Sequence, residues 1–129
     1  MAVLNLSPDS FYRPSRFPVL DEALRAVERF VEEGADLLDI GAESSRPGAK
    51  PIAESLESER LTAVVEAVVK RFPLPVSVDT CKPKVAARVL DQGAVIINDI
   101  TGLQRHPEMA GIVARQQAGV IIMHMQGAP

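Results

Sequence analysis

Short, continuously apolar runs alternate along the chain with longer stretches in which apolar residues recur at helical spacing. The short runs cover residues 2–6, 37–40, 76–78, 95–98 and 120–123. Unbroken apolarity, rather than alternation, is typical of parallel strands that are covered on both faces. These runs therefore predict five parallel β-strands.

The stretches between them predict four helices. The first has inward positions at Leu20, Ala23, Leu24, Val27, Phe30 and Val31, and Gly34 ends it. The second covers residues 54–71, with inward Leu61, Val64, Val65, Val68 and Val69 ahead of Pro73 and Pro75. The third covers residues 83–92 before Gly93, and the fourth lies between Pro107 and Gly119.

This repeated strand–helix order indicates an α/β fold with a parallel sheet. A flavodoxin-like open sheet and part of a (β/α)8 barrel are both compatible with the pattern. Only six residues follow Met123, which is too few for the helix that normally covers the last strand of an open sheet. The partial barrel is therefore favoured.

Charge and composition exclude several classes of protein. The 129 residues contain 14 Lys and Arg against 17 Asp and Glu, without a basic cluster, so no nucleic-acid partner is expected. The longest apolar runs, of about five residues, are far too short to span a membrane. Cys81 is the single cysteine and no basic leader follows Met1, which favours the reducing cytoplasm over a secreted, disulfide-linked protein.

Polar residues follow every predicted strand. They are Asn5, Asp39 with the loop 41–48, Asp79 with Thr80, Asn98 with Asp99, and His124. Any one of them could only cap a helix or start a turn. Because parallel strands bring their carboxyl ends to one edge, the set predicts a functional site there.

Five segments carry a family resemblance. They are Asn5-Leu-Ser-Pro-Asp-Ser-Phe, Asp39-Ile-Gly-Ala-Glu-Ser-Ser-Arg-Pro-Gly-Ala, Val76-Ser-Val-Asp-Thr, Ile96-Ile-Asn-Asp-Ile and Met123-His-Met-Gln-Gly. In this order and spacing they resemble the dihydropteroate synthase family of pterin-binding barrels. The resemblance implies a (β/α)8 TIM barrel of which residues 1–129 supply about five strands and four helices, as the N-terminal part of a pterin-binding domain. It also implies a folate-pathway transferase.

The resemblance further implies the substrates and the site residues. The family condenses (7,8-dihydropterin-6-yl)methyl diphosphate with p-aminobenzoate, giving 7,8-dihydropteroate and pyrophosphate, and its full-length members are expected to be homodimers. Asp79 and Asn98 match pterin-binding positions, and Asp79 is also predicted to stabilise positive charge on the ring. Ser45 and Arg46 match substrate-binding positions of the p-aminobenzoate loop. Asn5 matches a position that contacts Mg²⁺, the expected cofactor.

Two departures from the family pattern affect the loops. Ser45 stands where Thr is common, which keeps the hydroxyl but loses the methyl that fixes its rotamer. Tyr12-Arg-Pro-Ser-Arg16 replaces a stretch that usually contains Asp-Gly-Gly. Elsewhere, Glu54, Glu57, Glu59 and Arg60 are expected to form solvated first turns of a helix, and Cys81 is expected to pack rather than react.

Other functions remain as alternatives. A receiver domain would need paired acids after its first strand and a Lys after its fifth, and a methyltetrahydrofolate methyltransferase would lack the two long loop motifs. A catalytically inactive pterin-binding fragment or an interaction subunit stays open. Five strands cannot close a barrel, so the first and fifth would expose edges. The isolated chain is therefore expected to be unstable or to associate, with little synthase activity.

Overall fold

The protein alternates strands and helices along the part of the chain that its computed structural model describes, residues 1–6, 16–44 and 48–124, with side chains in the first helix from residue 20. The strands are β1 (Ala2–Asn5), β2 (Leu38–Gly41), β3 (Val76–Asp79), β4 (Ile96–Asp99) and β5 (Gly119–Ile122). The helices are α1 (Arg16–Glu32), α2 (Glu54–Arg71), α3 (Pro83–Asp91) and α4 (Glu108–Arg115). Each strand lies within one residue of its predicted run.

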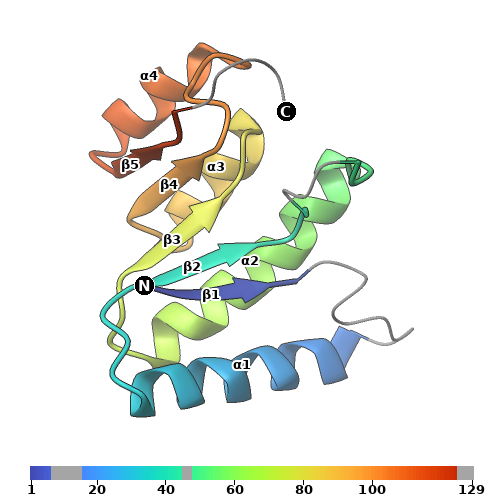
Figure 1. The fold of residues 1–129 in the computed structure, drawn as a ribbon, viewed down its shortest axis with the longest axis vertical. Coiled ribbons are helices and arrows are strands. Elements are labelled where there is room, and N and C mark those ends of the chain that lie inside the picture. Colours follow the sequence, from blue (N-terminus) through green and yellow to red (C-terminus); the bar gives the residue numbers. More distant parts are fainter. Residues whose placement is uncertain (7–15, 45–47, 125–129) are drawn as a thin grey trace.

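All five strands are parallel and follow one another in the order β1-β2-β3-β4-β5 (Figure 1). Right-handed crossovers between strands in sequential order place the connecting helices on the same face of the sheet. A doubly wound open sheet instead reverses its strand order at a switch point. The sequential order therefore confirms the partial barrel and excludes the flavodoxin-like arrangement.

The hydrophobic core lies between the sheet and its helices. Leu38, Ile40, Val76 and Val78 alternate along β2 and β3 on the helix-facing side, and all are almost fully buried. The inward stripe of α2, namely Leu61, Val64, Val65 and Val68, packs in the same cluster. Burying each such side chain contributes about 1.5–3 kcal/mol, so this layer holds the central strands in place.

The edge strands are covered less completely. Val3 of β1 is 60% exposed, and Val120 and Ile122 of β5 are 39% and 53% exposed. The interpretation of every apolar run as a strand covered on both faces is therefore wrong for β1 and β5, because each has a neighbouring strand on one side only in the described sheet. The expected exposure of the first and fifth strands is confirmed.

Helix ends follow local backbone rules. Gly34 has φ +88° and its N–H donates to Val31, which ends α1 as predicted. Gly93 has φ +110°, and a Cβ there would lie 2.8 Å from Cγ1 of Val69, so glycine is needed both for conformation and for the approach of α2.

Among the described helices, none is long and apolar enough to cross a membrane.

Candidate functional site

Four residues at the carboxyl ends of neighbouring strands form one row across the sheet. The register pairs Asn5 with Gly41, Gly41 with Asp79, and Asp79 with Asn98. Residues paired in a parallel sheet point to the same face, and this face is opposite the helix-facing side. The fold thus brings the predicted site residues Asn5, Asp79 and Asn98 onto one surface.

Gly41 keeps this surface open beside Asp79. A Cβ at position 41 would lie 3.4 Å from Cβ and 3.6 Å from Oδ2 of Asp79. A single methyl group would already be in contact, and any longer side chain would cover the carboxylate. The glycine at position 41 therefore places no side-chain atoms against the Asp79 carboxylate.

Asp39 and Asn98 are linked across the sheet. The Asn98 side-chain Nδ2 donates a hydrogen bond of 3.2 Å to Oδ2 of Asp39. The other carboxylate oxygen of Asp39 is buried and has no hydrogen-bond partner among the described residues. Asp39 itself is only 4% exposed, so a carboxylate lies beneath the strand-end row with one acceptor unused.

Asp79 has an unusual protonation equilibrium. Burial is the main cause that raises its pKa to about 7, and the negative charges of Asp39, Glu57, Asp99 and Glu43 raise it further. Asp79 does not cap α3: the N-cap residue is Lys82, and no side chain donates or accepts a cap hydrogen bond there. A carboxyl group that titrates near neutrality in an open row is typical of a functional site rather than of a helix cap.

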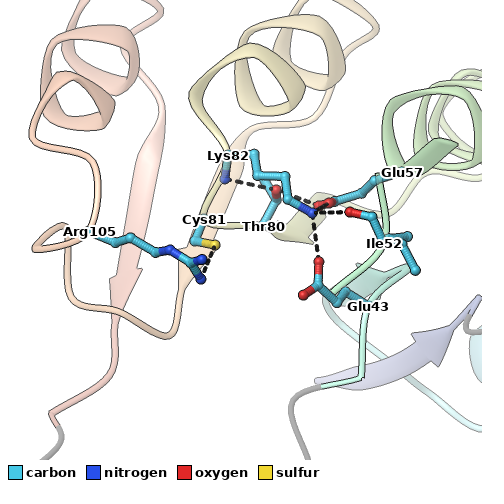
Figure 2. A network of polar contacts seen from close by, with 7 residues as sticks. All are labelled: Glu43, Ile52, Glu57, Thr80, Cys81, Lys82 and Arg105. Carbon is cyan, nitrogen blue, oxygen red and sulfur yellow. Dashed lines mark hydrogen bonds and ion pairs between the residues drawn. The ribbon is translucent and has the colours of Figure 1, made fainter. Parts of the chain in front are cut away.

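A polar network adjoins this row and centres on Lys82 (Figure 2). Its ammonium donates to Oε2 of Glu43 at 2.7 Å, to the carbonyl oxygen of Ile52 at 3.0 Å, and to Glu57. Burial would lower the pKa of Lys82, but the hydrogen bonds and charges of the two glutamates outweigh it, and the pKa is raised. Lys82 thereby joins both sides of the loop after β2 to the turn after β3.

Glu57 corrects one prediction. The prediction that Glu57 lies on a solvated first turn of α2 is wrong, because this residue is only 1% exposed. Its Oε1 accepts a hydrogen bond of 2.6 Å from the Thr80 hydroxyl, and its Oε2 pairs with Lys82. The hydroxyl oxygen of Thr80 also accepts from the backbone N–H of Lys82 at 3.2 Å. The signal was present in the sequence, because Glu57 lies four residues before Leu61 on the inward face of the helix.

Asp99 has a local structural role. Oδ1 accepts from the backbone N–H and hydroxyl of Thr101 at 2.8 and 2.7 Å, and Oδ2 accepts from the Leu103 N–H at 3.2 Å. Gly102 and Leu103, with φ of 63° and 64°, form the turn that this carboxylate stabilises. Asp99 is therefore the strand-end acid for which the turn interpretation is correct.

Two other polar candidates add little to the site. Burial raises the pKa of the Cys81 thiol, and Sγ lies 4.0 Å from Nη1 of Arg105 (Figure 2). A raised pKa keeps the thiol protonated, which agrees with packing rather than with nucleophilic chemistry. His124 lies just after β5 and is exposed.

The remaining predicted residues fall in two loops. Ser45 and Arg46 lie outside the described residues, as does the altered first loop up to residue 15. Glu43 and Ile52, which border the loop containing Ser45 and Arg46, are both bound by Lys82. The ends of that loop are thus fixed beside the strand-end row.

No group of three or more His, Cys, Asp or Glu side chains able to hold a metal ion exists within the described ranges. Asn5 lies exposed at the end of β1, in the same row as Asp79. Its amide oxygen suits a hard cation such as Mg²⁺, which often keeps several waters and takes further ligands from substrate phosphates. The donor set therefore fits a cation shared with a ligand and does not form a complete protein cage.

Comparison with known proteins agrees with this geometry. The family model described as pterin binding enzyme matches residues 1–129. A dihydropteroate synthase of Haemophilus influenzae is 44% identical over 129 residues, covering 100% of this chain and 46% of that protein. The structure of a dihydropteroate synthase from Clostridium difficile, determined in the presence of pteroic acid, matches with a TM-score of 0.91 at 33% identity. It covers 99% of this chain and 49% of the other.

The structure of a dihydropteroate synthase from Xanthomonas albilineans with 4-aminobenzoic acid matches with a TM-score of 0.88 at 41% identity, covering 99% of this chain and 47% of the other. The chain belongs to the pterin-binding enzyme family. Within that family it corresponds to the pterin-binding domain of dihydropteroate synthases, and its five strands and four helices match the N-terminal half of their TIM barrel. The chain spans about half the length of the relatives it matches.

Proposed function

We propose that residues 1–129 supply the N-terminal part of a dihydropteroate synthase and bind the dihydropterin substrate at the strand-end row. The observation that carries this proposal is the register of Asp79 with Asn98 on adjacent strands, beside the space left by Gly41. The reaction joins (7,8-dihydropterin-6-yl)methyl diphosphate to p-aminobenzoate and gives 7,8-dihydropteroate and pyrophosphate.

The chemistry of the row suits the edge of a dihydropterin. That edge carries an amino group and a ring N–H as donors, next to ring acceptors. Ionised Asp79 accepts two hydrogen bonds, and Asn98 both donates and accepts. Together the two residues favour binding of this polar edge over binding of a purely apolar ring.

Asp79 also acts in the chemical step. When the bond between the pterin methylene carbon and the diphosphate oxygen breaks, the electron pair leaves with pyrophosphate and the ring becomes positively charged. A carboxylate held against the ring stabilises that charge. The aniline nitrogen then forms the new C–N bond and releases a proton, so the residues of this chain chiefly hold, orient and exclude water.

The leaving group and the second substrate use the loops. Ser45 and Arg46 provide a hydroxyl and a guanidinium for anionic oxygens, and Lys82 fixes the ends of their loop through Glu43 and Ile52. Asn5 would hold Mg²⁺ together with the diphosphate, and such an ion would neutralise the charge that the leaving group gains.

A chimera tests this function. Residues 1–129 replace the matching 46% of the Haemophilus influenzae relative, so that the rest of the barrel comes from that protein. We expect dihydropteroate formation from the two substrates, and a loss of at least about 100-fold in turnover for Asp79→Ala. Ser77→Ala in the same chimera is the matched control, because Ser77 lies two residues earlier on the same strand face.

The outcome that contradicts the proposal is a folded chimera with no turnover and no dihydropterin binding. Full turnover by a folded Asp79→Ala chimera would refute the assigned role of Asp79. Circular dichroism and thermal melting establish which variants are folded.

A further inference from the structure

We infer that Asp39 is a positioning residue that holds the Asn98 amide in the orientation needed to bind the pterin edge. The inference rests on the proposed function and deepens it, since neither the family resemblance nor the strand-end row assigns Asp39 a role. The observation behind it is the hydrogen bond of 3.2 Å that the Asn98 side chain donates to Asp39.

The position of Asp39 permits this contact. Asp39 is in register with Ser77, and Ser77 is in register with Ile96. Asp39 therefore lies on the same face of the sheet as Asp79 and Asn98, in the row that precedes theirs by two residues along each strand. Ser77 is small and fully buried between them. The short side chain on β3 leaves room for Asp39 of β2 to meet Asn98 of β4 across the sheet face.

The chemistry of the pair fixes the direction of the amide. The NH₂ group of Asn98 is the end of the amide that faces Asp39, because Nδ2 donates to Oδ2 of the carboxyl group. The amide carbonyl then points away from Asp39, and one N–H remains available beside it. Without the carboxylate, no other described side chain accepts this hydrogen bond from Asn98, so ligand binding itself must select the competent orientation of the amide and the apparent affinity falls.

The burial of Asp39 argues against a merely structural function. A carboxylate that is 4% exposed and accepts one hydrogen bond among the described residues is costly for folding. Its Oδ1 is buried without a hydrogen-bond partner in the described part of the chain. An apolar residue at this position would avoid both costs, so the carboxylate is retained for what it does to Asn98.

A double-mutant cycle on dihydropterin binding tests the inference. The variants are Asp39→Ala, Asn98→Ala and their combination, with Ser77→Ala as the control at the same depth of the sheet. Binding of 6-hydroxymethyl-7,8-dihydropterin is measured by titration calorimetry in the 129-residue chain and in the chimera. We expect Asp39→Ala to weaken binding about tenfold in an otherwise unchanged background, and hardly at all in the Asn98→Ala background.

Asp39→Asn provides the conservative variant. It keeps an acceptor for Asn98, but its own side-chain amide can flip. The affinity of this variant for the dihydropterin should therefore lie between those of the original protein and Asp39→Ala, about threefold below that of the original protein. It is nearly isosteric with Asp39. If Asp39→Ala does not fold, the cycle is run with Asp39→Asn, whose smaller loss must also vanish in the Asn98→Ala background.

The results separate the two levels of the proposal. Absence of dihydropterin binding by the unsubstituted protein overturns the proposed function. Binding by the unsubstituted protein that is unchanged in Asp39→Ala and Asp39→Asn overturns the inference alone. A loss that persists in full when Asn98 is already Ala also overturns it, because Asp39 would then act independently of the amide.

Discussion

The middle of the sheet and its two edges are built differently. On β2, β3 and β4, apolar side chains pack against the helices while Asp39, Asp79 and Asn98 share the other face. On β1 and β5, side chains of the same apolar type, such as Val3 and Ile122, remain largely exposed. Similar apolar runs thus lead to different burial, depending on whether a strand has neighbours on both sides. The central strands carry the packed core and the candidate site, whereas the edge strands leave apolar side chains exposed.

The largest effect is expected at Glu57, which joins the central region to α2. Glu57→Leu removes the buried carboxylate that pairs with Lys82 and accepts from Thr80. Lys82 keeps its contacts with Glu43 and the Ile52 carbonyl, but it loses its buried partner and the Thr80 hydroxyl loses its acceptor. The substitution should therefore cost about 3 kcal/mol of the free energy of unfolding. Chemical denaturation measures it.

Glu66→Gln is the matched control on the same helix. Glu66 pairs with Lys70 at 2.6 Å, but both side chains are exposed. A change below about 0.5 kcal/mol is expected there. Equal destabilisation by the two substitutions would show that Glu57 is not part of a buried network.

Val78→Ala and Val120→Ala compare the centre with an edge directly. Val78 is fully buried on β3, so its truncation should cost about 2 kcal/mol. Val120 is 39% exposed on β5, and the same truncation should cost less than about 0.5 kcal/mol in the isolated chain. Unfolding curves of both variants provide the measurement.

The same pair sharpens the comparison when it is placed in the chimera. If a following helix covers β5 there, Val120→Ala should become more costly and approach the cost of Val78→Ala. An unchanged, small cost in the chimera would mean that β5 is an exposed edge in the complete barrel also.

The pH dependence of stability should report on Asp79. Its pKa is raised to about 7 in the folded protein, so folding favours the neutral carboxyl group. Stability from this group is fully present below about pH 4, falls as the pH rises toward 7, and is flat above that. Asp79→Asn removes this loss, so its stability relative to the original protein should increase between pH 4.5 and pH 8, by at most about 3 kcal/mol.

Dihydropterin binding should change with pH in the opposite direction. The ionised carboxylate is the better acceptor, so affinity should rise as the pH increases through about 7. Urea denaturation and binding titrations over pH 4.5–8 test the two trends. Stability and affinity that rise together would contradict the assignment of both effects to Asp79.

The smallest effect on stability is expected at the exposed side of β5. Ile122→Lys places a charge on a side chain that is 53% exposed, so its cost should stay below about 0.5 kcal/mol. It should nevertheless reduce self-association, because charged residues discourage pairing at an exposed strand edge. Sedimentation at several protein concentrations measures the effect, and identical association by both proteins would contradict the role of this edge.

Much of the fold could be predicted from the sequence because it depends on local signals. Apolar runs fixed each strand to within one residue, and glycines such as Gly34 marked helix ends where φ is positive. The strand order could not be derived from such signals, since a parallel open sheet and a partial barrel share the same pattern. The prediction that the edge strands are covered on both faces is wrong for the same reason, because the exposure of a strand depends on neighbours that are distant in the chain.

The candidate site was predicted in part. Asn5, Asp79 and Asn98 could be identified from motif and position, since strand ends converge at one edge. The sequence predicts an exposed Glu57, because acidic residues in a first helical turn usually face solvent. Its partner Lys82 lies 25 residues away, at the start of another element, so no local pattern indicates the pair. The Asp39–Asn98 bond joins residues 59 apart, and no local pattern predicts which strand-end side chains meet.

Equilibrium binding of 6-hydroxymethyl-7,8-dihydropterin to the 129-residue chain, compared with Asp79→Ala and Ser77→Ala, tests the central claim most directly. The strand-end row predicts saturable binding at one site, a loss of about 100-fold in Asp79→Ala, and unchanged affinity in Ser77→Ala. Binding of equal strength by a folded Asp79→Ala protein, or no binding by the folded, unsubstituted chain, would contradict the claim that this row is the pterin site.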